Sequence, residues 1–200
     1  MQNQWDERYA RQEYIYGTEP NNFLKEKLSL IKPGCILFPA EGEGRNAVFA
    51  AKQGWKTDAF DQSNEAKKKA LQLADQNRVS INYSVQSLDA WNPEPEKYDC
   101  IALIFVHLPE DLRLRVHQSA VRALKPGGIL ILEAFSISQL SRTSGGPKTA
   151  ELLFTLDQLK SDFSNLSGVT ISEKQVHLNE GPLHQGLAEV IQLTGYRPSV

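Results

Sequence analysis

The sequence predicts an α/β fold of three layers, with a seven-stranded, mostly parallel sheet between two layers of helices. Two observations carry this prediction. After Gly34, short apolar runs alternate with longer amphipathic segments, which is the pattern of repeated strand–helix units. The last two runs, residues 169–178 and 186–196, are joined by only a short segment. A strand, a short loop and a strand form an antiparallel hairpin, so we expect the sheet to end in one.

The expected strands of the parallel part are short and apolar. They span residues 35–40, 56–61, 81–85, 98–106 and 128–135. The last of these, GILILEAF, is a continuous apolar run, as expected of a strand buried on both faces. Pro126 and Gly127 before it suit the middle of a type II turn.

Three helices are expected between these strands. One spans residues 44–54 and stops at Gly54, and a second spans 64–77 with Ser63 as its N-cap. The third opens at Pro109, with acidic residues in its first turn, and we expect Leu114, Val121 and Leu124 to face the core. Residues 1–31, ahead of the first strand, are expected to form a helical cap.

Composition limits the classes of function. The chain has 200 residues, a net charge of −2 and a pI near 6.1, so we expect one domain and no broad basic face for nucleic acid. Residues 67–69, all lysine, are expected on the solvated side of a helix. Cys35 and Cys100 each lie in an apolar run without metal-ligand spacing, so they are expected to be buried thiols, and no metal site is expected. Neither a signal peptide nor a membrane span is visible, which predicts a cytoplasmic protein.

A glycine-rich loop follows the first expected strand. Gly42, Gly44 and Ala47 match the spacing of a dinucleotide-binding loop, which by itself is a weak signal. Asp61 ends the next expected strand, 17 residues after Gly44, where a carboxylate accepts hydrogen bonds from ribose hydroxyls. The alternative role for Asp61 is that of an acidic residue at a helix N-terminus. Its place at the strand end favours ribose.

Both NAD and S-adenosylmethionine contain an adenosine ribose, so Asp61 does not separate them. The glutamates of the loop favour the second ligand. NAD would place a doubly charged pyrophosphate beside Glu41 and Glu43, where like charges repel. S-adenosylmethionine has no phosphate and carries cationic sulfonium and ammonium groups. An NAD-dependent oxidoreductase nevertheless stays as an alternative.

The order of motifs EGEGRNA, AFD, YDCIALIFVHL and LKPGGILILE, followed by a hairpin, resembles the class I S-adenosylmethionine-dependent methyltransferases. The resemblance covers nearly the whole chain and implies a Rossmann-like fold. Within that group, GEGRNAVFAAKQGWKTDAFD resembles the tellurite-resistance methyltransferases, and WDERYARQEYIYGTEPNNFL looks like a methyltransferase N-terminal cap. The implied organisation is a single methyltransferase domain over 1–200, with a cap (1–31), a cofactor-binding core (34–134) and a substrate-side loop, helix and hairpin (135–200).

The resemblance also implies the residues of the cofactor site. They are Ala40, Glu41, Gly42, Gly44, Asn46, Asp61, Gln62, Ser87, Leu88, Phe105 and Tyr16. Ala40, Gly42 and Gly44 would face the methionine and ribose portion, with Asn46 opening the helix beside it. Ser87 and Leu88 would contact adenine, and Phe105 would border the methyl group. Two positions depart from the family pattern: Phe38 replaces an acid of the first strand, for which Glu41 is a candidate substitute, and Ala40 replaces the first glycine.

The acceptor is expected at the carboxyl ends of the parallel strands. The segment NEGPLHQ should project there, so Glu180 and His184 are candidates to line the acceptor site, although a solvated hairpin tip fits equally. His107, just after a strand, is a second candidate base, or a polar residue bonded to nearby backbone. Residues 138–151, rich in glycine and polar residues, are either a mobile cover or a plain connector.

The expected function is methyl transfer from S-adenosylmethionine to a small molecule by in-line displacement. A soft nucleophile, such as a thiol or a tellurium or selenium oxyanion, would need little base catalysis. A protein that binds S-adenosylmethionine without catalysis is the third possibility, which the departures at Phe38 and Ala40 motivate. The sequence leaves the acceptor and the oligomeric state open.

Overall fold

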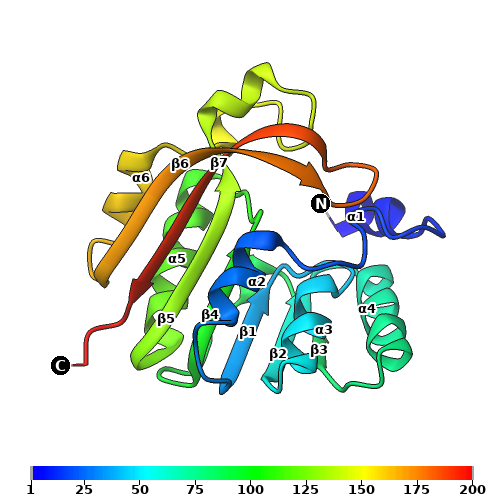
Figure 1. Ribbon diagram of the computed structural model, residues 1–200, viewed down its shortest axis with the longest axis horizontal. Helices are drawn as coiled ribbons and strands as arrows, with labels where there is room; N and C mark the ends of the chain where they lie inside the picture. The colour runs from blue at the N-terminus through cyan, green and yellow to red at the C-terminus, as the bar shows by residue number, and fades with distance from the viewer. Residues whose placement is uncertain (1, 200) are drawn as a thin grey trace.

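The computed structural model describes residues 2–199, and in them the chain forms one seven-stranded sheet of order β3-β2-β1-β4-β5-β7-β6 (Figure 1). Neighbours from β3 to β5 are parallel, whereas β7 is antiparallel to both β5 and β6. The predicted fold class and terminal hairpin are therefore confirmed. The strands are β1 (Cys35–Pro39), β2 (Lys56–Asp61), β3 (Asn82–Val85), β4 (Tyr98–Ile104), β5 (Leu124–Phe135), β6 (Ser167–Asn179) and β7 (Gln185–Tyr196).

Helices cover both faces of the sheet and complete the three layers. The helices are α1 (Gln2–Tyr9), α2 (Asn22–Leu28), α3 (Arg45–Lys52), α4 (Asn64–Gln76), α5 (Glu110–Ala123) and α6 (Leu156–Asp162), with short 3-10 turns η1 (Leu88–Ala90), η2 (Ile137–Ser141) and η3 (Ala150–Leu152). Apolar residues of α2, α3 and α4 pack on one face, and those of α5 and α6 pack on the other. No helix among residues 2–199 is both long and apolar enough to cross a bilayer.

Local signals explain several boundaries. Ser63 caps α4, as predicted, because its hydroxyl accepts a hydrogen bond from the Ala66 amide at 3.1 Å. Thr155 and Gln158 form a capping box that starts α6. Gly127 has a φ of 77°, the value that a type II turn requires, yet the strand assignment of β5 runs through it from Leu124.

Two side-chain predictions for the helices were wrong. Leu114 is only half-buried, because the buried side of α5 carries Val116 and Ala120 together with the polar Arg113 and His117. Both polar side chains bond the Asp162 carboxylate of α6, which allows them to be buried between the helices. Lys69 is not on a solvated face, since its side chain is 12% exposed and is paired with Glu43 of the loop between β1 and α3.

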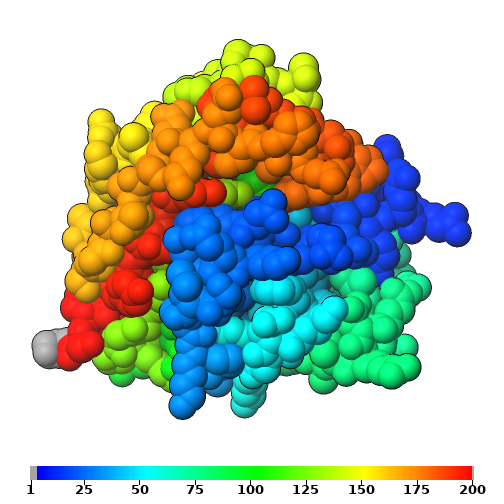
Figure 2. Space-filling view, viewed as in Figure 1, coloured from blue at the N-terminus to red at the C-terminus, as the bar shows by residue number. Residues whose placement is uncertain are grey.

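The hairpin and the N-terminal segment meet above the carboxyl ends of the parallel strands. Because β6 and β7 are long, their connection reaches from the sheet edge to the segment before α2 (Figure 1). The Leu183 amide donates to the Ile15 carbonyl at 3.3 Å, and a Cβ on Gly17 would lie 3.2 Å from the Gly181 nitrogen. In Figure 2 the hairpin (orange) arches over the N-terminal segment (blue) on this face. The two segments thus enclose the end of the sheet at which ligands bind in open α/β folds.

Candidate functional site

The loop between β1 and α3 turns sharply below the N-terminal segment. Ala40, Gly42 and Gly44 all have positive φ angles, of 52°, 68° and 91°. Gly44 also permits close packing of α3 on α4, because a Cβ there would lie 2.6 Å from the Ala70 Cβ. Ala40 takes the left-handed conformation although it has a side chain, which accounts for a glycine at the same position in the family pattern.

Glu41 caps α3 from within this loop. Its Oε1 accepts hydrogen bonds from the amides of Asn46 and Ala47, both at 2.8 Å. Burial raises the pKa of Glu41 to about 7, and these two bonds offset part of that effect. The amides that Glu41 occupies are those that a pyrophosphate would need at the start of a helix. The loop is therefore built for a ligand without a phosphate at this position.

Asp61 ends β2 beside the loop. Its Oδ2 accepts from the Gly42 amide at 3.1 Å and its Oδ1 accepts from the Ser63 amide at 3.0 Å. Burial raises the pKa of Asp61 to about 6, against the lowering effect of these bonds. Each carboxylate oxygen retains acceptor capacity beyond the bonds it makes. The carboxylate is therefore able to accept further hydrogen bonds.

The neighbouring predicted residues lie around Asp61. Gln62 follows it and is half-buried, and the Asp61 carbonyl accepts from the Gln86 amide at 2.9 Å, which brings the end of β3 alongside. Ser87 donates to the Asp89 carboxylate at 3.1 Å, and Leu88 begins η1 and packs against the core. Gln62, Ser87 and Leu88 thus lie just beyond the carboxyl ends of β2 and β3.

Glu43 fastens the N-terminal segment to the loop. Its Oε1 accepts from Lys69 Nζ at 2.6 Å and its Oε2 accepts from the Tyr16 amide at 3.4 Å. The same Lys69 Nζ donates to the Glu13 carbonyl at 2.6 Å, so one lysine of α4 holds both segments. Glu43 is therefore neutralised by the chain itself and does not face a ligand as a free charge.

Tyr9 and Tyr16 reach the loop from the cap. Tyr9 is buried, and a Cβ on Gly42 would lie 2.8 Å from its hydroxyl oxygen. The Tyr16 hydroxyl accepts from Arg8 at 3.3 Å, and its ring centroid lies 4.6 Å from that of His184. Tyr9 therefore contacts the glycine loop, and Tyr16 contacts the hairpin.

Aromatic rings surround His184 at the hairpin. The ring centroids of Phe105 and Phe135 lie 4.7 Å and 5.3 Å from that of His184. Phe105 follows β4 with a φ of 55°, a strained conformation for a bulky residue, and its amide donates to the Glu133 carbonyl at 2.7 Å. Gly145 covers the other side, because a Cβ there would lie 2.7 Å from His184 Cδ2 and 3.3 Å from Nε2.

A buried polar network connects the hairpin to the start of α3, next to the glycine loop. Glu180 Oε2 accepts from Arg45 Nη2 at 2.9 Å and lies 3.3 Å from His184 Nδ1. Glu180 and His184 are 7% and 5% exposed, so the alternative of a solvated hairpin tip is wrong for these two side chains. Asn21 Nδ2 donates to Glu180 at 3.1 Å and to Glu133 at 2.6 Å. The structure thus brings Glu180 and His184 to the loop, as the hairpin direction predicted.

His107, the other predicted base, is held by backbone on both sides of its ring. Nδ1 lies 2.7 Å from the Leu152 carbonyl and Nε2 accepts from the Phe135 amide at 3.3 Å. Burial lowers the pKa of His107 to about 4. With both nitrogens occupied, His107 fits the alternative of a polar residue bonded to nearby backbone.

Sequence reasoning missed three members of the network: Arg45, Glu133 and Asn21. Glu133 had a visible signal, because it is the one acid within the apolar run GILILEAF. Its buried carboxylate accepts from Asn21 and from Gln192. Arg45 and Glu180 are 135 residues apart, so only the topology brings them together.

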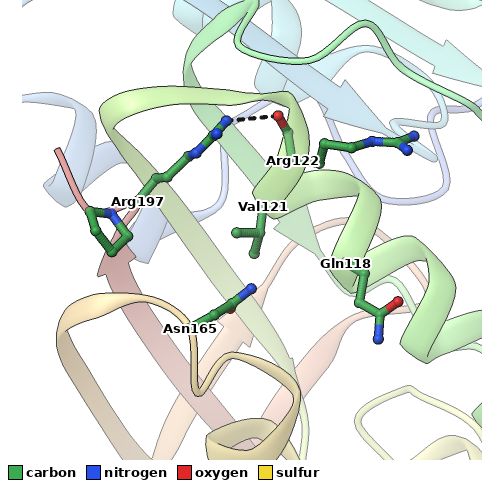
Figure 3. A pocket seen from close by; sticks show the side chains of 6 residues that line it. Gln118, Val121, Arg122, Asn165 and Arg197 are labelled. Carbon is green, nitrogen blue, oxygen red and sulfur yellow. Dashed lines mark hydrogen bonds between the residues drawn. The ribbon is translucent and has the colours of Figure 1, made fainter. Parts of the chain in front are cut away.

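A separate surface depression of about 340 Å³ lies away from these residues. It is lined by Gln118, Val121, Arg122, Asn165, Arg197 and Pro198 (Figure 3). Arg197 donates to the carbonyls of Arg122 and Leu124 and to the Glu96 carboxylate, so its charge is already used. The depression lies at the beginning of β5, opposite the carboxyl ends of the strands.

Comparison with known proteins agrees with this geometry. Residues 36–128 match the model of a methyltransferase domain. No curated protein sequence matches the chain. The methyltransferase-domain match covers the glycine loop, Asp61 and the strand that precedes Phe105, and it does not favour an oxidoreductase.

Solved structures share the fold at low identity. A structure described for the conversion of a disulfide bond into a thioacetal group during echinomycin biosynthesis has a TM-score of 0.78 and 16% identity over 100% of this chain and 92% of the other. TehB from Haemophilus influenzae has a TM-score of 0.74 and 14% identity, with coverage of 98% and 66%. Phosphoethanolamine N-methyltransferase 2 from Haemonchus contortus, in complex with phosphomonomethylethanolamine and S-adenosylhomocysteine, has a TM-score of 0.68 and 13% identity. The alignment covers 88% of this chain and 51% of the other.

The strand order is that of the methyltransferase fold, and residues 36–128 match a methyltransferase domain. The chain is therefore a methyltransferase enzyme with S-adenosylmethionine as its cofactor.

Proposed function

We propose that the chain methylates a small, uncharged molecule with a soft nucleophile such as a thiol, and that His184 accepts the proton of the nucleophile. The observation that carries this proposal is the place of His184. Its ring lies among Tyr16, Phe105 and Phe135, while Nδ1 faces a carboxylate that is bonded to the cofactor loop. A base in a ring-lined space next to the loop suits transfer of a methyl group away from water.

The cofactor contacts follow from the loop. Asp61 has acceptor capacity for the two ribose hydroxyls, and Gln62, Ser87 and Leu88 flank the place of the adenine. Among residues 2–199, the one hydrogen bond to Glu41 Oε2 comes from Asn46 Nδ2 at 3.5 Å, which leaves this oxygen able to accept from the ammonium group. Ala40, Gly42 and Gly44 shape the backbone beneath the ligand, and Phe105 and Tyr16 border the methyl group.

When bound, the cofactor supplies an electrophilic methyl group: its carbon–sulfur bond breaks as the acceptor's lone pair forms a new bond, and S-adenosylhomocysteine leaves. The chain contributes position and a proton acceptor. Burial lowers the pKa of His184 below its usual value, partly offset by Glu180, so the imidazole is neutral near pH 7. If Nδ1–H donates to Glu180, Nε2 carries the lone pair that takes the proton of a thiol or hydroxyl.

The charges around this space favour an uncharged acceptor. Two cations at the loop are already paired, Arg45 with Glu180 at 2.9 Å and Lys69 with Glu43 at 2.6 Å. A phosphorylated or oxyanionic acceptor would have to compete for them. The tellurite-resistance resemblance, whose motifs include the loop with Arg45, keeps tellurium and selenium oxyanions as the second candidate. The cytoplasmic location also stays a prediction from the sequence.

The test is methyl transfer from tritiated S-adenosylmethionine to a panel of phenylmethanethiol, phenol, aniline, selenite and tellurite, with the full chain near pH 7. We expect phenylmethanethiol, which is uncharged at this pH, to be methylated fastest. His184→Asn should lower turnover of phenol by about 10²–10⁴ and that of phenylmethanethiol less, because a thiol needs less help with its proton. His177→Asn, which changes an exposed histidine on β6, is the matched control. Turnover of an oxyanion without turnover of phenylmethanethiol would overturn the proposed acceptor class.

A further inference from the structure

We propose that Glu180 is a positioning residue for the base: it holds His184 as the tautomer protonated on Nδ1, and Arg45 fixes Glu180 in the orientation that makes this possible. This inference rests on the proposed function, since it specifies how the same site prepares its base. Glu180 Oε2 accepts a hydrogen bond from Nη2 of Arg45, the first residue of α3, at 2.9 Å. The same oxygen lies 3.3 Å from His184 Nδ1.

The carboxylate is fixed from both of its oxygens. Oε1 accepts from Asn21 Nδ2 at 3.1 Å, while Oε2 is shared between the guanidinium and the imidazole. Burial opposes ionisation, but the bond to His184 and the charge of Arg45 lower the pKa of Glu180 to about 2. An ionised carboxylate has no hydrogen to donate, so the nitrogen that faces it must carry the proton.

This arrangement determines which nitrogen is free. With the proton on Nδ1, the lone pair lies on Nε2, and no hydrogen bond from the described residues reaches that atom. Nε2 lies on the side of Gly145, next to the Phe105 and Phe135 rings. Without the carboxylate, a neutral imidazole would be free to adopt the other tautomer, whose Nε2–H cannot accept a proton.

The charged and titratable groups around His184 come from four elements. Glu180 belongs to the hairpin, Arg45 to α3, Tyr16 to the N-terminal segment, and His107 to the segment after β4. Glu180 favours the imidazolium, whereas Arg45 disfavours it. In Glu180→Gln the favourable charge is lost and Arg45 loses its counter-charge. The pKa of His184 should therefore fall further.

The first readout does not depend on activity. Nitrogen-15 NMR of histidine-labelled protein at pH 7 should show His184 protonated on Nδ1 in the wild type, and a mixed or Nε2-protonated ring in Glu180→Gln. Glu94→Gln, the same change at an exposed residue, should leave the spectrum of His184 unchanged. A wild-type ring protonated on Nε2 would overturn the inference, even if methyl transfer is observed.

The second readout is the pH dependence of turnover with phenol. In the wild type, turnover should rise with pH through the pKa of His184. In Glu180→Gln the plateau should fall at least about tenfold and the acidic limb should move to lower pH. In Glu180→Asp, which keeps the negative charge, the acidic limb should lie at a pH closer to that of the wild type than the limb of Glu180→Gln does.

A lower plateau with an unmoved limb in Glu180→Gln would mean that Glu180 only supports the fold, and would contradict the inference. If the wild type methylates no acceptor, the proposed function fails, while the NMR measurement still decides how His184 is held.

Discussion

Gly44 offers the sharpest test of how the cofactor loop is packed. In Gly44→Ala, the new Cβ would lie 2.6 Å from the Ala70 Cβ and 2.7 Å from the Ala70 Cα, so the backbone of α4 would have to move. The φ of 91° adds left-handed strain. Strain of about 1–2 kcal/mol and overpacking of about 1–3 kcal/mol together predict a loss of about 2–5 kcal/mol in unfolding free energy.

Gly54 provides the matched control. Its φ is 88°, nearly that of Gly44, but a Cβ there would meet nothing within 4 Å. Gly54→Ala should therefore lose only the strain, about 1–2 kcal/mol. In urea unfolding followed by circular dichroism, with a slope of about 2–3 kcal/mol per molar, the midpoint should fall by about 1–2 M for Gly44→Ala and about 0.5 M for Gly54→Ala. Equal shifts in the two variants would refute the packing argument.

Three further predictions follow from the same region. Ala40→Gly should raise the unfolding free energy by about 0.5–1 kcal/mol, because relief of left-handed strain at a φ of 52° exceeds the entropy cost of glycine; a lower urea midpoint would contradict this. Lys69→Ala leaves the buried Glu43 carboxylate without its ion-pair partner, which should cost about 3 kcal/mol and loosen the N-terminal segment. Trypsin should therefore cut after Arg11 at least about tenfold faster than in Lys68→Ala, which changes an exposed lysine of the same helix. Equal cleavage of the two variants would show that Lys69 does not hold the N-terminal segment. Because the pKa of Asp61 is raised to about 6, its carboxylate is lost as pH falls through that value, so the dissociation constant of S-adenosylhomocysteine should rise about tenfold per pH unit below 6; the same slope in Asp61→Asn would place the titrating group elsewhere.

The sequence predicted the parts of the fold that depend on local pattern. The bounds of β2 were predicted correctly because an apolar run lies between Gly54 and a capping serine. The direction of the terminal hairpin followed from its short connection, and with it the approach of Glu180 and His184 to the carboxyl ends of the strands.

Other features depended on which partner each charged group selects in three dimensions. Three carboxylates, Glu41, Glu43 and Asp61, compete for the same loop, and the sequence does not say that Glu41 takes the amides of α3 while Glu43 takes Lys69. The pairing of Arg45 with Glu180 likewise requires the packing of α3 against the hairpin. Periodicity describes how helices and strands bury their faces, but it does not resolve such long-range ion pairs.

The central claim concerns the ligand of the glycine loop, and calorimetric titration of the full chain tests it most directly. S-adenosylmethionine and S-adenosylhomocysteine should bind the wild type, NADH should not, and Asp61→Ala should lose binding of the first two. Binding of NADH, without binding of S-adenosylhomocysteine, would contradict the account, because it would require a pyrophosphate where Glu41 already occupies the amides of Asn46 and Ala47.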